Sequence, residues 1–129
     1  MIKIILSLLF ITSSLFSLSG ESVYVKHCAS CHKMQKPTSG LLAPPMPSVS
    51  KRLQRDISSK EKLVAFVKDY IQNPSKEKGH CSEKAFIHLG TMPPIGKSLT
   101  NEELDAVSLW LYENFQHPEK IKSCDTNKY

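Results

Sequence analysis

The chain has 129 residues, and 17 Lys and Arg against 12 Asp and Glu give it a formal net charge of +5. This length allows one small domain with a single core. The sequence has no Arg/Lys cluster interleaved with aromatic residues, so nucleic-acid binding is not expected. The modest excess of lysine fits an acidic protein partner or an ordinary lysine-rich soluble surface.

Residues 1–19 have the layout of a secretory signal peptide. Lys3 precedes an apolar run, and small residues follow at Ser17, Ser19 and Gly20. The apolar run carries several hydroxyls and is shorter than the roughly 20 apolar residues of a spanning helix, which argues against a retained anchor. We predict export to the periplasm with cleavage after Ser19, or alternatively after Gly20, which leaves a single domain over residues 20–129.

A short helix is predicted from Glu21 to His27, with Val23 and Tyr24 facing a core. It leads into Cys28-Ala-Ser-Cys31-His32, a C-x-x-C-H sequence of the kind that attaches c-type haem. Cysteines three residues apart lie on one face of a helical turn, so both sulfurs can form thioethers with the vinyl groups of one porphyrin. The following histidine is then delivered to the iron as the proximal ligand.

Two other functions of the cysteines fit the sequence less well than haem attachment. A thioredoxin-like dithiol lies near a βαβ pattern, which the sequence lacks. A zinc site needs a second matched pair of ligands, whereas Cys81 and Cys124 stand far apart and alone. The motif therefore predicts one covalent haem c bound through Cys28, Cys31 and His32.

Residues 36–47 hold four prolines and a glycine, and residues 90–96 hold two prolines, so both segments are predicted to be extended loops. Between them, an amphipathic helix is predicted over residues 59–72, with apolar residues at i, i+3, i+4, i+7 and i+8 from Leu63. Ser58 with Glu61 is predicted to form a capping box at its start, and Asn73-Pro74 to end it.

A third helix is predicted from Asn101 to about Phe115. Thr100 and Glu103 form another capping-box pattern, and Leu104, Val107 and Leu111 share one apolar face. No period-two strand pattern is visible. The expected fold is therefore all-α, with about three main helices and long prolyl loops around one haem. Loops of this length are usually functional or disordered, and a bound cofactor would supply the missing core.

The second axial ligand of the iron is expected from a later residue. The side chains considered are the methionines and histidines outside the motif: Met34, Met46, Met92, His27, His80, His88 and His117. Met92 is favoured because the two prolines that follow it restrict its backbone and stiffen the loop that presents its sulfur. His88 is the second choice, and the other histidines are expected at the surface or around the ligands.

Most of the mature chain, from Gly20 to about Phe115, resembles class I monohaem cytochromes c of the small bacterial c-553 or c-551 kind. The resemblance is carried by "CASCH", "LLAPPM", "YIQNP" and "MPPIGKSLTNEELDAVSLWL". It implies that Met92 is the distal ligand and that the carbonyl of Pro44 accepts a hydrogen bond from the proximal imidazole. It also implies that the first and last helices cross, with Val23 and Tyr24 against Val107 and Trp110 or Leu111.

The sequence departs from compact members of that family in an insertion over residues 75–90 and an extra tail over residues 116–129. Each segment carries one of the remaining cysteines, and we hypothesise a disulfide between Cys81 and Cys124, with two separate thiols as the alternative. The insertion also brings His88 closer to the reach of the iron.

The porphyrin pocket is expected to be lined by apolar side chains: Leu41, Leu42, Met46, Val49 and Leu53 on one side, and Ile95 and Leu99 on the other. Lys51, Arg52 and Arg55 either reach the haem propionates or form a solvated charged face.

These features together predict a periplasmic one-electron carrier, not an enzyme, that meets its redox partner proteins transiently. Two alternatives remain open at this point. One is a haem subunit of a larger oxidoreductase complex. The other is a small-ligand sensor or peroxidase-like haem protein, which requires that Met92 is not bound to the iron.

Overall fold

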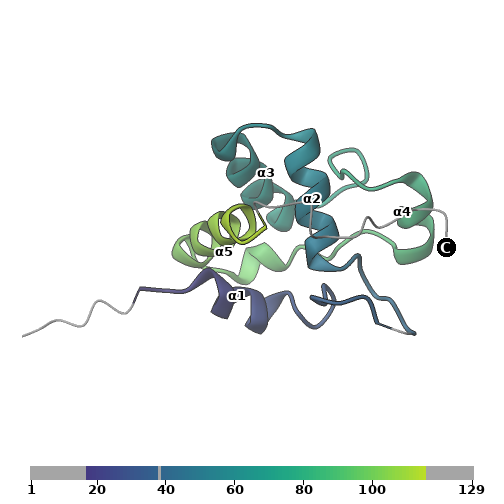
Figure 1. The fold of residues 1–129 in the computed structure, drawn as a ribbon, viewed down its shortest axis with the longest axis horizontal. Helices are drawn as coiled ribbons and strands as arrows, with labels where there is room; N and C mark the ends of the chain where they lie inside the picture. Colours follow the sequence, from purple (N-terminus) through teal and green to yellow (C-terminus); the bar gives the residue numbers. More distant parts are fainter. Residues whose placement is uncertain (1–16, 38, 116–129) are drawn as a thin grey trace, which may run out of the picture.

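The computed structural model describes residues 17–37 and 39–115. These residues form five α-helices and one 3₁₀ helix, with no strand among them (Figure 1). The elements in chain order are α1 (Gly20–His27), α2 (Met46–Asp56), α3 (Lys60–Gln72), α4 (Glu83–Leu89), η1 (Ile95–Ser98) and α5 (Asn101–Glu113). The predicted all-α class is confirmed. Most of the predicted signal peptide and the tail over residues 116–129 lie outside the described residues.

The three predicted helices are present with small changes at their ends. Thr100 accepts a hydrogen bond from the backbone N–H of Glu103, and the Glu103 carboxylate accepts one from the N–H of Thr100, so the capping box of α5 is confirmed. The capping box predicted at Ser58 is wrong. The cap of α3 is Ser59, whose hydroxyl oxygen accepts from the N–H of Lys62 while its own proton goes to Glu61.

Two further helices, α2 and α4, were not predicted. Helix α2 begins inside the proline-rich segment, which is possible because Pro47 lies in its first turn, where no intrahelical N–H partner is needed. Its apolar residues Met46, Val49 and Leu53 follow helical spacing, but Ser50 interrupts the stripe. Helix α4 lies within the insertion between a Ser82 cap and Gly90, whose φ of 75° ends it.

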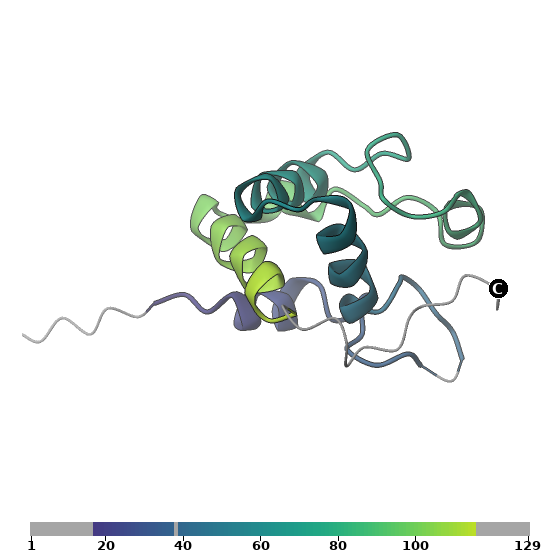
Figure 2. The ribbon, with the colours of Figure 1, turned by 45° about the horizontal axis from the view of Figure 1, so that its top comes forward.

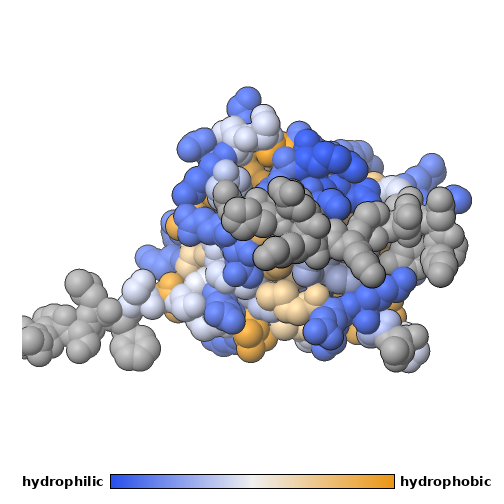
Figure 3. Space-filling model, in the orientation of Figure 1, coloured by the Kyte–Doolittle hydropathy of each residue, from blue (hydrophilic) through white to orange (hydrophobic). Residues whose placement is uncertain are grey.

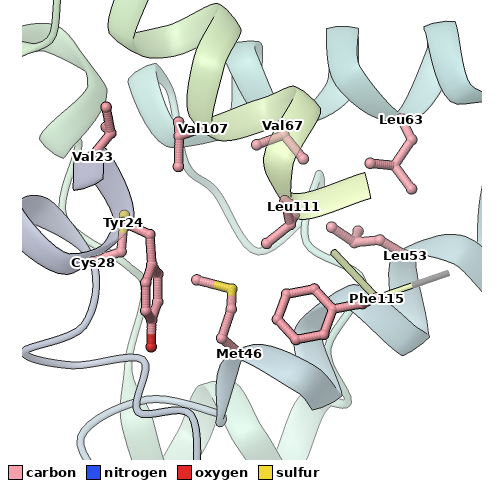
Figure 4. Packing of buried hydrophobic residues seen from close by; sticks show 10 residues of the cluster. All are labelled: Val23, Tyr24, Cys28, Met46, Leu53, Leu63, Val67, Val107, Leu111 and Phe115. Carbon is pink, nitrogen blue, oxygen red and sulfur yellow. The ribbon is translucent and has the colours of Figure 1, made fainter. Parts of the chain in front are cut away.

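Helix α5 lies at the centre of the packing. It contacts α1 and α3 most extensively and touches α2, while η1 packs against α3. The predicted crossing of the first and last helices is confirmed, because the rings of Tyr24 and Trp110 stack with centroids 4.9 Å apart. Figure 4 shows how α1, α2, α3 and α5 each contribute side chains to one cluster, with Leu63 and Val23 the most deeply buried.

A polar link joins α2 to the end of α5. The hydroxyl of Ser50, which is 1% exposed, donates to the carbonyl of Leu111 at 3.1 Å. The amide Nε2 of Gln54 lies 3.0 Å from Ser50 Oγ and 3.3 Å from the carbonyls of Tyr112 and Phe115. Since the last carbonyls of a helix have no partner within it, α2 supplies donors that α5 lacks.

The insertion extends away from the central helices, and in both ribbon views α4 lies at the opposite end of the molecule from α5 (Figures 1 and 2). Its first part returns to α2 and α3. Lys78 pairs with Asp69 at 2.7 Å, and Arg52 donates to the carbonyl of His80 at 3.1 Å. On the face seen in Figure 3, hydrophilic residues predominate and the hydrophobic residues form small separate patches.

Candidate functional site

A cavity of about 210 Å³ lies between the cysteine motif, α2, α3, α5 and the segments on either side of α4. Most of its wall is apolar, and α3 contributes Phe66, Val67, Tyr70 and Ile71 from one face. Those four residues belong to the apolar stripe that the sequence predicted for this helix. The stripe therefore serves two purposes, since Leu63 is buried in the core, Phe66, Tyr70 and Ile71 form the cavity wall, and the buried Val67 belongs to both.

The cysteine motif continues the end of α1 as one further turn. The N–H of Cys31 and the N–H of His32 both donate to the carbonyl of Cys28, at 3.2 and 2.9 Å. This turn places Cys28, Cys31 and His32 on the wall of the cavity. Burial, followed by the charge of the neighbouring Cys31, raises the pKa of the Cys28 thiol to about 11. The reactive cysteine of a thioredoxin-like dithiol has a lowered pKa, so the burial of Cys28 disfavours that chemistry.

The ring of His32 is held from the α2 side of the cavity. Its Nδ1 lies 2.7 Å from the carbonyl oxygen of Pro44. A carbonyl can only accept, so Nδ1 carries the proton and Nε2 keeps its lone pair. Burial lowers the pKa of His32, and the hydrogen bond to Pro44 opposes this effect only in part, which favours the neutral ring that a metal requires. The Tyr24 hydroxyl donates to the His32 carbonyl at 2.6 Å.

Met92 also lies on the cavity wall, on the loop between α4 and η1. His88, the alternative ligand, has an exposed side chain on α4 and is not among the lining residues. Of the two candidate distal ligands, Met92 therefore lines the cavity and His88 does not. His117 lies outside the described residues.

The sequence did not predict that His80 and Cys81 of the insertion, or His27 of α1, would lie on the cavity wall, but all three line it. Cys81 lies close to Tyr70, whose pKa is raised by burial and then by the charge of Cys81. The hypothesis of a disulfide with Cys124 stays a prediction, because Cys124 lies outside the described residues. In the sequence, the signals for an ordered helix in the insertion are Ser82, which precedes "EKAFIHL" as an N-cap, and Gly90, which follows it.

The expected apolar lining is largely present. Leu42, Met46, Val49, Leu53 and Ile95 line the cavity, whereas Leu41 and Leu99 do not. The basic side chains suggested for the propionates have other contacts. Arg52 holds the His80 carbonyl, and Arg55 pairs with Asp56 at 2.7 Å. In the part of the chain described here, no helix is long and apolar enough to span a membrane, and no group of three or more His, Cys, Asp or Glu side chains forms a separate metal site.

The site defines a class of protein, the c-type cytochrome domain, in which two cysteines and a histidine on one turn face an apolar cavity. The comparison with known families agrees. The sequence model of the family described as cytochrome c oxidase, cbb3-type, subunit III matches residues 18–111. The chain belongs to this family.

An uncharacterized protein of Aquifex aeolicus (strain VF5) is 41% identical over an alignment of 116 residues, and the match covers 78% of this chain and 76% of that protein. No solved structure matches the chain. The chain is therefore a class I monohaem c-type cytochrome with covalently bound haem c, and it serves haem-based electron transfer with redox partners.

The residues present fit this haem. The cavity offers two thiols on one helical turn, a neutral imidazole with its Nδ1 proton already bonded, and a thioether from a separate loop. These are the donor types that c-type haem uses for covalent attachment and for axial ligation.

Proposed function

We propose that this protein is a periplasmic one-electron carrier in which His32 and Met92 are the axial ligands of the haem iron. The observation that carries the proposal is that the two thiols, the His32 ring and Met92 all line one apolar cavity. A histidine and a methionine together fill both axial positions, so the iron has no open position for a substrate.

The haem supplies a one-electron change at its iron, and the chain sets the conditions for it. The hydrogen bond between Nδ1 of His32 and Pro44 fixes the tautomer and the orientation of the ring. The Met92 thioether favours the reduced state and raises the reduction potential. The apolar side chains of α2 and α3 exclude water from the cavity, which also influences the potential.

A carrier of this kind meets its donor and acceptor in brief encounters with small interfaces. The net positive charge of the chain favours partners with acidic surfaces, and such encounters weaken with added salt. A secretory signal over residues 1–19 would deliver the chain to the periplasm.

The visible absorption spectrum of the purified protein, oxidised and reduced, with and without carbon monoxide, tests this function. We expect a low-spin c-type spectrum with the weak far-red sulfur-to-iron band and no change on adding carbon monoxide. A low-spin spectrum without that band would contradict Met92 as the ligand. High-spin iron that binds carbon monoxide would contradict the carrier function and favour ligand sensing or peroxidase-like chemistry.

A second candidate is a haem subunit of a larger oxidoreductase. The description of the matching family names an oxidase subunit, which favours this candidate. Gel filtration of a native extract distinguishes the two, because a free carrier elutes at the size of the monomer and a subunit elutes with its complex.

A further inference from the structure

His80, on the insertion, resembles His32 in the way that its ring is held. Its Nδ1 lies 2.9 Å from Oδ2 of Asp56, at the end of α2. The pKa of Asp56 is lowered, first by its hydrogen bond with Arg55, so this side chain is a carboxylate at neutral pH. A carboxylate can only accept, so in the neutral ring Nδ1 carries the proton and Nε2 keeps its lone pair.

This arrangement is the usual one around a metal-binding histidine, which donates its other N–H to a carboxylate or a carbonyl. His32 has a carbonyl partner, and His80 has a carboxylate partner. Both histidines line the same cavity, and in the chain His32 precedes α2 whereas His80 follows α3. The cavity therefore contains two oriented imidazoles, of which the attachment motif uses only one.

The position of His80 is fixed by further contacts. Arg52 donates to its backbone carbonyl at 3.1 Å, and its ring stands edge-on to Phe66, another lining residue, with centroids 4.8 Å apart. His27 also lines the cavity, but its Nε2 lies 3.7 Å from the Glu103 carboxylate without a hydrogen bond, so no partner orients its ring. His88 is exposed and is not among the lining residues.

We propose that His80, oriented by Asp56, is a second donor for the distal position of the haem iron and binds there when Met92 leaves. The inference rests on the proposed His32 and Met92 ligation. In the exchange the bond from the Met92 sulfur to iron breaks, and a bond from His80 Nε2 to iron forms. In the neutral tautomer set by Asp56, Nε2 carries no proton, so its bond to iron releases none, and no electron is transferred. The exchange lowers the reduction potential, because a thioether is replaced by a nitrogen ligand.

The test compares the haem-loaded variants Met92→Ala, Met92→Ala/His80→Phe and Met92→Ala/His88→Phe by absorption and by carbon monoxide titration. We expect Met92→Ala to lose the sulfur band, remain low-spin and have a lower potential than the wild type. The His80→Phe double variant is expected to become high-spin and to bind carbon monoxide about tenfold more tightly or better, since no side chain competes for the position. The His88→Phe double variant should match Met92→Ala.

A high-spin Met92→Ala protein would overturn the inference, and so would a His80→Phe double variant that stays low-spin. A different result would contradict the proposed His32 and Met92 ligation, namely a wild-type spectrum without the sulfur band. If Met92→Ala does not fold, the oxidised wild type and His80→Phe are compared in urea below the unfolding transition. There the wild type should lose the sulfur band and stay low-spin while His80→Phe becomes high-spin, and identical high-spin spectra would overturn the inference.

Discussion

Replacing Gln54 by Glu tests whether α2 stabilises the end of α5 through hydrogen bonds. The substitution keeps the size of the side chain but removes the N–H donors that face Ser50 Oγ and the carbonyls of Tyr112 and Phe115. An amide has two N–H groups, so two of these three acceptors are satisfied at a time.

The magnitude follows from those contacts. Each net hydrogen bond contributes about 0.5–1.5 kcal/mol to the free energy of unfolding. A carboxylate beside the negative end of a helix costs about 0.3–1 kcal/mol more. We therefore expect Gln54→Glu to lower the free energy of unfolding by about 2 kcal/mol. For a domain of this size that corresponds to a melting temperature about 8 °C lower.

The assay is thermal unfolding of the haem-loaded protein, followed by far-ultraviolet circular dichroism. Gln35→Glu is the matched control, because it makes the same charge change at an exposed side chain and should alter stability by less than about 0.5 kcal/mol. Neither glutamine lines the cavity, so both variants should keep the wild-type haem spectrum. Equal melting temperatures for Gln54→Glu and Gln35→Glu would refute the reasoning.

Three further predictions concern packing, a buried hydroxyl and pH. Gly96→Ala should lower the free energy of unfolding, measured by urea titration, by about 1–3 kcal/mol, because the added Cβ would lie 2.8 Å from the backbone of Ile71. An unchanged urea midpoint would contradict this prediction. Tyr24→Phe should cost about 1 kcal/mol through loss of the hydrogen bond to the His32 carbonyl, with no change in the low-spin spectrum; a wild-type urea midpoint would argue against that bond. The pKa of Glu103 is lowered, first by its hydrogen bond with the backbone of Thr100 at the start of α5. The ionised carboxylate therefore stabilises the fold above pH 4.5, and this stabilisation is lost as the pH falls through the lowered pKa. The stability advantage of the wild type over Glu103→Gln should therefore shrink in melts between pH 6 and pH 3, and a constant difference would contradict the assignment.

Much of the fold was predictable because its signals are local. The capping box at Thr100 and the apolar stripe from Leu63 follow from residues a few positions apart. Helix α2 was missed for a physical reason, since the polar residue in its apolar stripe, Ser50, is satisfied by a carbonyl 61 residues away. Only the packed structure reveals such a partner.

The candidate site, like the fold, could be predicted from the sequence only where its signals are local. The attachment motif could be recognised without the fold, because two thioethers and a histidine ligand must lie on one turn and therefore lie close together in the chain. The sequence also led to Met92, through the prolines that stiffen its loop. The tertiary structure alone decided that His88 lies outside the cavity and that His80 lies on its wall, oriented by Asp56. The fold of an insertion depends on contacts with distant helices, and no local pattern encodes which of its side chains those contacts turn inward.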